Sequence, residues 1–327
     1  MLETETVLDR RRLRRSVSFW RAAGIGGLAL AVGALAFGGD KLASMSGKKQ
    51  IARIAIEGTI TEDRDQLKML KEIAENKNVS ALLVYVNSPG GTTTGGEALY
   101  EGLRDVAKTK PVVAQFGTVA ASAAYIAGLA TDHIVARGNS ITGSIGVLVE
   151  WPEVVQLLDK VGVKMNTVKS GVLKASPSPF ETLTDDSRKV AAGMVNDGFK
   201  WFLSLVETRR GVKPSDIAGL VEGKIFSGRE ALEVKLVDQI GGEDEAVAWL
   251  KDVKNVDKDA KVVDWKPEST GVSFLGFKAM AANALTALLG PELGPEASQL
   301  INTLFSAQGK STLGLDGLLS VWHPSEK

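Results

Sequence analysis

The chain has 327 residues, in which 39 Lys and Arg residues balance 39 Asp and Glu residues, so it has no general field that would attract nucleic acid. It contains no cysteine and only two histidines, which excludes disulfides and cysteine nucleophiles and argues against a metal or other cofactor. Its 35 glycines and many small aliphatic residues favour α/β packing in one large domain or two modest ones.

The amino-terminal segment has the pattern of a membrane anchor. Residues 1–21 are rich in arginine, and residues 22–39 form an uncharged run close to the roughly 20 residues that cross a bilayer. Because the basic residues precede the run, we expect a single-pass anchor in a bacterial inner membrane, with residues 1–21 cytoplasmic and the remainder extracytoplasmic, periplasmic in a Gram-negative cell. A cleaved signal peptide is the alternative, since Ala34-Leu35-Ala36 resembles a cleavage site.

Strands and helices alternate after a polar linker at residues 40–50. Apolar runs and helical spacing predict strands at 51–56, 81–86, 111–116, 133–136, 145–149 and 163–168, and helices at 63–76, 95–107, 121–130, 153–161, 185–211 and 243–251. Turns are expected at 88–91 and 117–120. Repeated strand–turn–helix units predict an α/β domain over residues 51–265 whose ligand site lies at the carboxyl ends of the strands. Residues 266–327 form an apolar helical tail that is expected to contact a partner or the membrane.

Two of these strand ends carry residues that suit an acyl-transfer site. Ser122 stands where a helix begins, and a serine hydroxyl needs a base to take its proton. With histidine nearly absent, lysine is the expected base, and Lys174 is the candidate. A free lysine titrates near 10.4, so an apolar pocket must supply roughly 4–5 kcal/mol to bring the amine near neutrality.

Negative charge on a reacting carbonyl needs preorganised hydrogen-bond donors. The N–H of Ala123 lies at the start of the predicted helix, and the Gly90-Gly91 pair permits close backbone approach, so these residues are the expected oxyanion hole. Ser144 is a candidate for orienting the lysine amine by a hydrogen bond.

Five motifs occur in a specific order along residues 51–250: Tyr85-Val-Asn-Ser-Pro-Gly-Gly91, Ala120-Ala-Ser-Ala-Ala-Tyr125, Ile141-Thr-Gly-Ser-Ile-Gly-Val147, Lys169-Ser-Gly-Val-Leu-Lys174 with Ser178-Pro-Phe180, and Gly228-Arg-Glu-Ala231 with Leu236-Val-Asp238. This part of the chain resembles the signal peptide peptidase A family, which comprises membrane-anchored serine–lysine proteases of the crotonase/ClpP-like fold (peptidase family S49).

The resemblance implies a role for each candidate residue. Ser122 would be the nucleophile, Lys174 the general base and Ser144 the hydroxyl that positions the lysine. Gly91 and Ala123 would donate the oxyanion N–H groups, and Gly90 would shape the turn. The family also implies a ring-like homo-oligomer in which adjacent copies donate serine and lysine. With one core per chain, an octamer is expected, and a single chain can hold the pair apart.

Three positions depart from the family pattern: Ala123-Ala124 replaces a common Gly-Gly, Ala175 a common aspartate, and Lys235 a common glycine. None of them is the nucleophile or the base. The expected function is therefore that of a membrane-anchored serine endopeptidase that degrades cleaved signal peptides and similar apolar peptides. The alternatives are an acyl-CoA-processing enzyme of the crotonase fold and a non-catalytic membrane scaffold.

Overall fold

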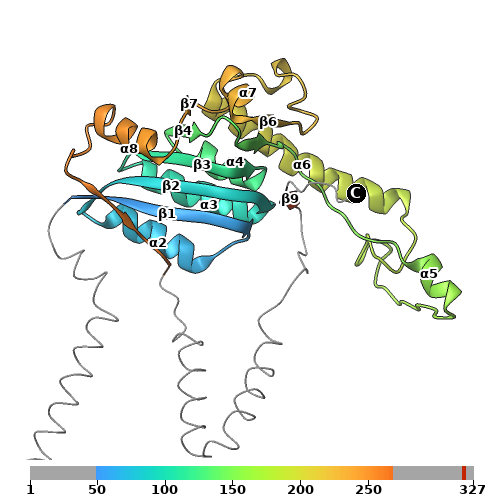
Figure 1. Cartoon of the computed structure of the whole chain (residues 1–327). Helices are drawn as coiled ribbons and strands as arrows, with labels where there is room; N and C mark the ends of the chain where they lie inside the picture. Colours follow the sequence, from blue (N-terminus) through green and yellow to red (C-terminus); the bar gives the residue numbers. More distant parts are fainter. Residues whose placement is uncertain (1–48, 268–318, 322–327) are drawn as a thin grey trace, which may run out of the picture. The chain divides into compact units, whose positions relative to one another are not determined.

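A mixed α/β fold is built around one sheet (Figure 1) in a computed structural model that describes residues 49–267 and 319–321. Its main path runs in the order β6-β5-β3-β2-β1-β8, with β4 beside β3, β7 beside β4, and β9 beside β2. The strands are β1 (Gln50–Ile60), β2 (Val79–Thr92), β3 (Val112–Ala121), β4 (His133–Ala136), β5 (Ile141–Gly143), β6 (Ile225–Ser227), β7 (Gln239–Ile240), β8 (Lys261–Asp264) and β9 (Leu319–Val321).

The helices alternate with the strands through the first half of the described chain. They are α2 (Arg64–Glu75), α3 (Thr93–Ala107), α4 (Ala123–Leu129), α5 (Val155–Lys160), α6 (Asp185–Arg210), α7 (Gly228–Glu233) and α8 (Glu243–Asp252), with a short 3₁₀ turn at Pro214–Asp216. β1, β2 and β3 pair in parallel, so α2 and α3 are the crossover helices that the repeated units predict.

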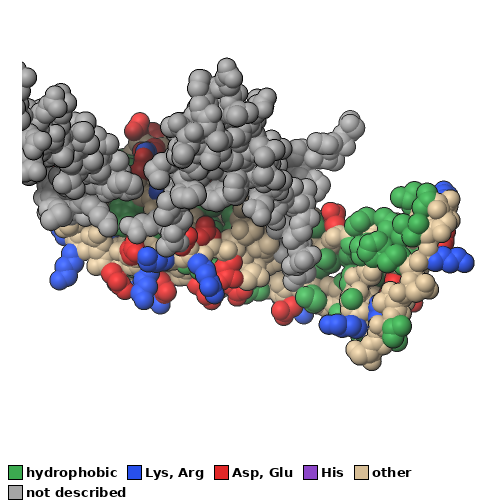
Figure 2. Space-filling model, turned by 90° about the horizontal axis from the view of Figure 1, so that it is seen from below, with side chains coloured by type: hydrophobic (Ala, Val, Ile, Leu, Met, Phe, Trp, Pro, Cys, Tyr) green, Lys and Arg blue, Asp and Glu red, His purple; other side chains and the backbone are tan. Residues whose placement is uncertain are grey.

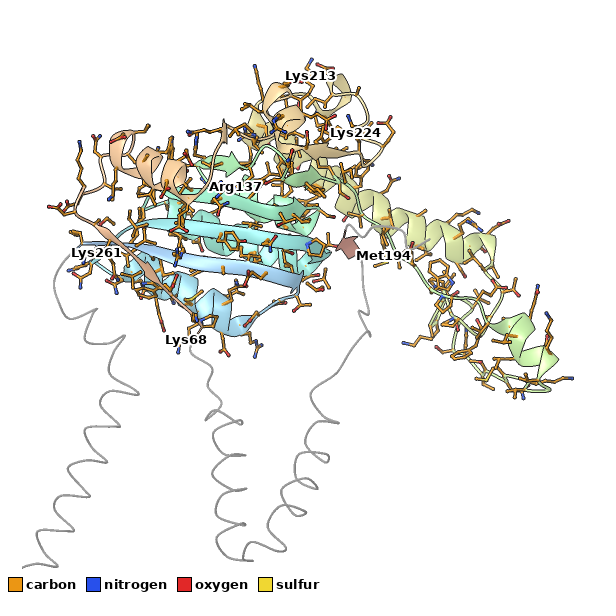
Figure 3. The ribbon with its side chains drawn as sticks, viewed as in Figure 1. Lys68, Arg137, Met194, Lys213, Lys224 and Lys261 are labelled. Atoms are coloured by element: carbon orange, nitrogen blue, oxygen red, sulfur yellow. The ribbon has the colours of Figure 1, made fainter. Side chains whose placement is uncertain are left out.

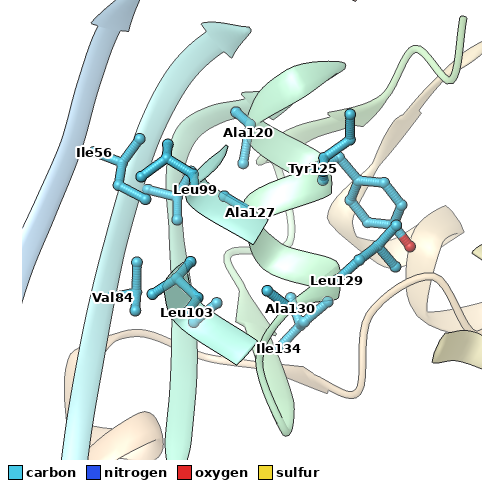
Figure 4. Packing of buried hydrophobic residues seen from close by; sticks show 14 of the residues in the cluster. Ile56, Val84, Leu99, Leu103, Ala120, Tyr125, Ala127, Leu129, Ala130 and Ile134 are labelled. Carbon is cyan, nitrogen blue, oxygen red and sulfur yellow. The ribbon is translucent and has the colours of Figure 1, made fainter. Parts of the chain in front are cut away.

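Both faces of the central strands are buried, which explains their nearly continuous apolar sequences. Leu82 and Val84 of β2 pack in the larger cluster with α2, α3 and α4, whereas Leu83, between them, packs with α8 on the other face. Figure 4 shows Val84, Leu99 and Leu103 side by side in the larger cluster. Full burial of one such leucine contributes about 1.5–3 kcal/mol, so this packing fixes α3 and α4 on the sheet.

The long helix α6 begins and ends as its sequence predicts. The Thr184 side chain accepts a hydrogen bond from the N–H of Ser187 at the amino end. At the other end, Arg209 and Arg210 lie in the last turn, where cations interact favourably with the helix dipole, and Gly211 adopts the left-handed conformation with φ 64°.

The expected turns at residues 88–91 and 117–120 are wrong, because both segments are strand. β1 continues to Ile60 and pairs with Gly90 and Gly91, which keeps β2 extended through the Ser-Pro-Gly-Gly sequence. The ladder between β2 and β3 is irregular after Val86, where the Asn87 side chain accepts from the N–H groups of Thr118 and Val119. The residues that favour a turn in these two segments therefore mark an irregularity within two long strands.

The strands expected at residues 145–149 and 163–168 are also absent, although the Ile145 side chain is buried in the core. The strand nearest to the first region is β5, which ends at Gly143, and the φ of 49° at Ser144 interrupts the extended backbone before residue 145. In the second region Val163, Met165 and Val168 are exposed and have no strand beside them. Alternating apolar residues there do not indicate sheet pairing.

The membrane anchor predicted at residues 22–39 lies outside the described residues, as do the helical tail segments predicted between 268 and 318. Within residues 49–267 and 319–321, no helix combines the length and the apolar character needed to cross a membrane.

Candidate active site

Ser122 occupies a sharp turn between β3 and α4. Its φ of 59° and ψ of −122° place a residue with a side chain in a backbone region that such residues rarely adopt. Its N–H donates to the carbonyl oxygen of Gly143 at 2.9 Å, and its own carbonyl oxygen accepts from Tyr125 and Ile126, so both sides of the turn are held. Strain of this kind, held by surrounding hydrogen bonds, is the geometry of a nucleophile elbow between a strand and a helix.

The helix α4, which follows Ser122, is entirely buried, and a hydrogen bond joins it to the loop that contains Leu236. The Tyr125 hydroxyl donates to the carbonyl oxygen of Leu236 at 2.8 Å, and burial raises the pKa of this phenol. The Asp238 carboxylate accepts from the N–H of Ile134 and from the Arg210 guanidinium, which ties α6 to the same loop. The Leu236-Val-Asp238 motif thus holds the helix below the serine.

Gly90 and Gly91 lie in the extended end of β2, and each has a different reason to be glycine. A Cβ on Gly91 would stand 1.8 Å from the carbonyl oxygen of Ile60, so only glycine allows β1 and β2 to approach this closely. Gly90 has a φ of 112°, which favours glycine. Its N–H donates to the Ser88 hydroxyl at 3.1 Å, and that hydroxyl donates to the carbonyl oxygen of Gly58 at 2.6 Å.

Ser144 lies next to Ser122 because of strand pairing. β3 and β5 are parallel, and Ala121 is paired with Gly143, so the two serines each follow one member of this pair. Neighbouring strands are about 4.8 Å apart, which puts both serines at the same carboxyl edge of the sheet. The N–H of Ser144 donates to the carbonyl oxygen of Lys224 at 3.0 Å, beside β6, where Figure 3 labels this lysine.

Lys174 does not join these residues within one chain. It is exposed and belongs to residues 151–184, which we call the arm and which contain α5. The segment between α5 and α6 lies at the amino end of α6, well away from α4 and from the end of β3 (Figure 1). In the same motif, Lys169 forms an ion pair with Glu181 inside the arm. The structure therefore unites Ser122, Ser144 and the end of β2, and leaves Lys174 apart.

The arm exposes many apolar side chains. In Figure 2, hydrophobic side chains gather on the surface of the arm. Val168 and Val172 are almost wholly exposed. The others in the arm are Leu157, Val161, Val163, Met165, Leu173 and Phe180, and Val190 and Met194 continue the series on α6, where Figure 3 labels Met194. Exposed apolar surface on this scale marks an interaction site.

Two residues that shape the site, Asn87 and Ser88, were not among the predicted site residues. The Asn87 side chain holds the irregularity at which β2 and β3 separate, and the Ser88 hydroxyl fixes Gly90. The signal was present, because Asn and Ser beside Pro and Gly commonly bond to neighbouring backbone groups. Among the described residues, no group of three or more His, Asp or Glu side chains is arranged to hold a metal ion.

Comparison with the sequences of known proteins places this chain in a family. The family model Peptidase family S49 matches residues 104–257, and the model Clp protease matches residues 47–137. A "Putative protease" from Synechocystis sp. is 34% identical over 67% of this chain and 79% of its own length. A "Putative signal peptide peptidase SppA" from Enterococcus faecium is 33% identical over 73% of this chain and 74% of its own length.

The solved structure of a mutant membrane-bound stomatin-specific protease has a TM-score of 0.44 and 15% identity, covering 68% of this chain and 99% of that one. The two sequence relatives are each more than 30% identical to this chain over more than two thirds of their own length, which is enough to assign the family. The chain belongs to peptidase family S49, in its signal peptide peptidase A group, and is a serine peptidase.

Proposed function

We propose that the chain is a membrane-anchored endopeptidase with a Ser/Lys dyad that cleaves apolar peptides, including the remnants of signal peptides. The observation that carries this proposal is the strained turn at Ser122, at the head of a buried helix and beside Ser144. Ser122 is the nucleophile, Lys174 the general base and Ser144 the group that orients the lysine amine. The N–H groups of Gly91 and Ala123 stabilise the oxyanion.

The chemistry follows from these assignments. The neutral amine of Lys174 takes the proton of the Ser122 hydroxyl while its oxygen attacks the peptide carbonyl carbon. The carbonyl oxygen becomes negative and is stabilised by backbone donors, which include the first-turn N–H of Ala123, a position that has no acceptor within the helix. The protonated amine then gives its proton to the departing amine as the peptide bond breaks. Water, activated by the same lysine, hydrolyses the ester and restores both residues.

An adjacent copy supplies the lysine in this proposal. Lys174 is exposed in an arm that carries many exposed apolar side chains, and its segment lies away from Ser122 in the same chain. Docking of the arm on a neighbour would bury both the apolar groups and the amine, and removal of water favours the neutral, basic form of an amine. Repetition of such a head-to-tail contact closes a ring, for which we propose eight copies.

The membrane assignment rests on the basic residues 1–21 and the apolar residues 22–39, which we propose as a single-pass anchor in a bacterial inner membrane with the catalytic domain outside the cytoplasm. The peptidase domain is then residues 51–265. Cleaved signal peptides are apolar and membrane-derived, so an anchored peptidase with an apolar arm suits them as substrates.

A mixing experiment tests the shared site. Ser122→Ala and Lys174→Ala chains are each expected to be inactive on an apolar peptide. If they are co-expressed in equal amounts and assemble at random in a symmetric ring, about one quarter of the sites combine an intact serine with an intact lysine from the neighbour. We therefore expect about a quarter of wild-type activity per site, measured by mass spectrometry of the peptide products.

Two results would contradict parts of the proposal. Wild-type rates from either single variant would contradict the proposed Ser/Lys dyad. Two inactive variants that remain inactive when mixed, with both chains present in the purified assembly, would place serine and lysine in the same chain. A co-expressed pair of wild-type chains with the same two affinity tags is the control for the purification.

A further inference from the structure

Lys169 has an unusual environment within the arm. Across residues 159–175, every residue except Lys169 is exposed, including Val168 directly before it. The Lys169 side chain is only 14% exposed, whereas Val168 is almost wholly exposed. Long charged side chains are normally the exposed ones, and a charge that is largely buried is expected to have a partner. The arm reverses the usual pattern at this lysine.

The partner of Lys169 is Glu181, which follows Lys174 in the sequence. The Lys169 ammonium forms an ion pair with the Glu181 carboxylate. Lys174 lies between these two residues in the chain and is itself exposed. The ion pair therefore holds together the two ends of the loop at residues 169–181, and Lys174 lies within the loop that this contact closes.

Hydrogen bonds hold the loop around Lys174 as well. The Lys174 N–H donates to the carbonyl oxygen of Gly171 at 3.0 Å, which forms a turn. The Ser176 hydroxyl lies 2.5 Å from the hydroxyl of Ser187, which is buried. The Ser187 hydroxyl is also bonded to Thr184, the residue that caps α6. The start of α6 thus fixes the loop directly after the lysine turn.

We propose that Lys169 and Glu181 are positioning residues, which hold the Lys174 turn in the form that presents its amine to Ser122 of an adjacent copy. This inference rests on the proposed function. An opposite charge nearby favours the charged form of an amine, whereas a general base must act in its neutral form. Lys169 is therefore the fixed cation of the loop, and Lys174 is the proton acceptor.

The loop needs such contacts because core packing does not order it. Residues 170–175 are all exposed, so the contacts at the two ends of this stretch supply the order that burial supplies elsewhere. The position of a catalytic group matters strongly, since a displacement of about 1 Å can lower a rate about 100-fold. Loss of the ion pair should therefore affect turnover more than folding.

Substitution by arginine separates the roles of the two lysines. Arginine keeps the positive charge and pairs well with carboxylates, but it does not give up its proton in proteins. Lys169→Arg should therefore keep kcat for an apolar peptide within about threefold of the wild-type value. Lys174→Arg should abolish hydrolysis of the same peptide, because its side chain cannot accept the proton of Ser122.

Removal of either charge tests the positioning. Glu181→Gln and Lys169→Met should each lower kcat by about tenfold or more with little change in KM. The reversed pair, Lys169→Glu/Glu181→Lys, should restore kcat to within about threefold of the wild-type value. Glu153→Gln and Lys160→Met are the matched controls at exposed positions elsewhere in the arm, and they should keep the wild-type constants.

A measurement of amide exchange requires no catalysis. Hydrogen–deuterium exchange read by mass spectrometry should be faster at residues 170–176 in Ser122→Ala/Glu181→Gln than in Ser122→Ala, and the reversed pair should slow it again. The thermal midpoints should agree within about 4 °C, because a partly exposed ion pair contributes little to global stability. Failure of the proposed function would show as wild-type rates in Lys174→Ala, and the exchange result would remain readable by itself.

Three results would overturn the inference. One is hydrolysis that Lys169→Arg abolishes as completely as Lys174→Arg does, which would make Lys169 a proton acceptor. Another is a wild-type kcat in Glu181→Gln. The third is a lower kcat in Glu181→Gln with unchanged exchange at residues 170–176, which would place the effect of this carboxylate outside the loop.

Discussion

The Tyr125 hydroxyl is the clearest link between the fold and the turn at Ser122, and its removal has a pH-dependent consequence. Tyr125 is fully buried on α4, three residues after Ser122, and donates to the carbonyl oxygen of Leu236 at 2.8 Å. Tyr125→Phe preserves the ring, which packs edge-on against Phe116 with 6.3 Å between the centroids. The change therefore removes one hydrogen bond and leaves the apolar packing intact.

At neutral pH the variant should be less stable than the wild type by about 1–3 kcal/mol, because a buried carbonyl oxygen loses its donor. Burial raises the pKa of Tyr125 in the folded chain above its ordinary value of 10. The neutral phenol thus contributes its full stability below about pH 10, and the contribution falls as pH rises towards the folded pKa, by about 1.4 kcal/mol per pH unit. Phenylalanine does not titrate, so the difference should shrink and disappear within about two units above pH 10.

The assay is urea unfolding of both full-length proteins in detergent, at equal protein concentration, from pH 8 to pH 11.5. Gly193→Ala is the control, because it adds no titrating group and its stability difference should be the same at every pH. A difference between wild type and Tyr125→Phe that stays constant above pH 10 would refute the reasoning, since it would show that ionisation of this phenol is not coupled to unfolding.

Three further substitutions test other parts of the structure. Gly91→Ala places a Cβ 1.8 Å from the Ile60 carbonyl oxygen and should shift the end of β2 by about 1 Å, reducing kcat/KM for a peptide about 100-fold while circular dichroism still reports a folded chain. Ser144→Ala should lower kcat by about tenfold to 100-fold with little change in KM, a pattern that steady-state kinetics separates from lost substrate binding. Gly193→Ala, within α6 and with no described atom within 4 Å of the new Cβ, should stabilise the chain by about 0.5–1 kcal/mol in urea unfolding.

Much of the fold could be predicted from the sequence because local pattern and tertiary environment agree there. The apolar run at 81–86 is buried on both faces, and α6 begins and ends at its capping residues. The failures arise where a neighbouring strand decides the outcome. Ser88-Pro89-Gly90-Gly91 has the composition of a turn, yet pairing with β1 keeps it extended. Nothing within that tetrapeptide reports the strand that lies beside it.

The candidate site was likewise predictable where the local sequence decides the structure and unpredictable where a distant segment decides it. Ser122 could be placed at the junction of a strand and a helix, but its φ of 59° depends on the hydrogen bond from its N–H to Gly143, more than 20 residues away in the sequence. The pairing of Ala121 with Gly143 that brings Ser144 to the same edge is equally non-local. β9 was not predicted at all, because three residues carry too little periodicity to distinguish a strand within a tail.

The position of Lys174 in the arm, away from the end of β3, has a physical consequence for the control of the site. A base that becomes neutral only when a neighbouring copy removes its water makes assembly a condition of catalysis under the proposed function. A lone chain would then hold an incomplete site and would be inactive towards other proteins before it reaches its ring. This condition arises from non-covalent contacts of the arm, so the proposed control of Ser122 needs neither a histidine nor a cysteine.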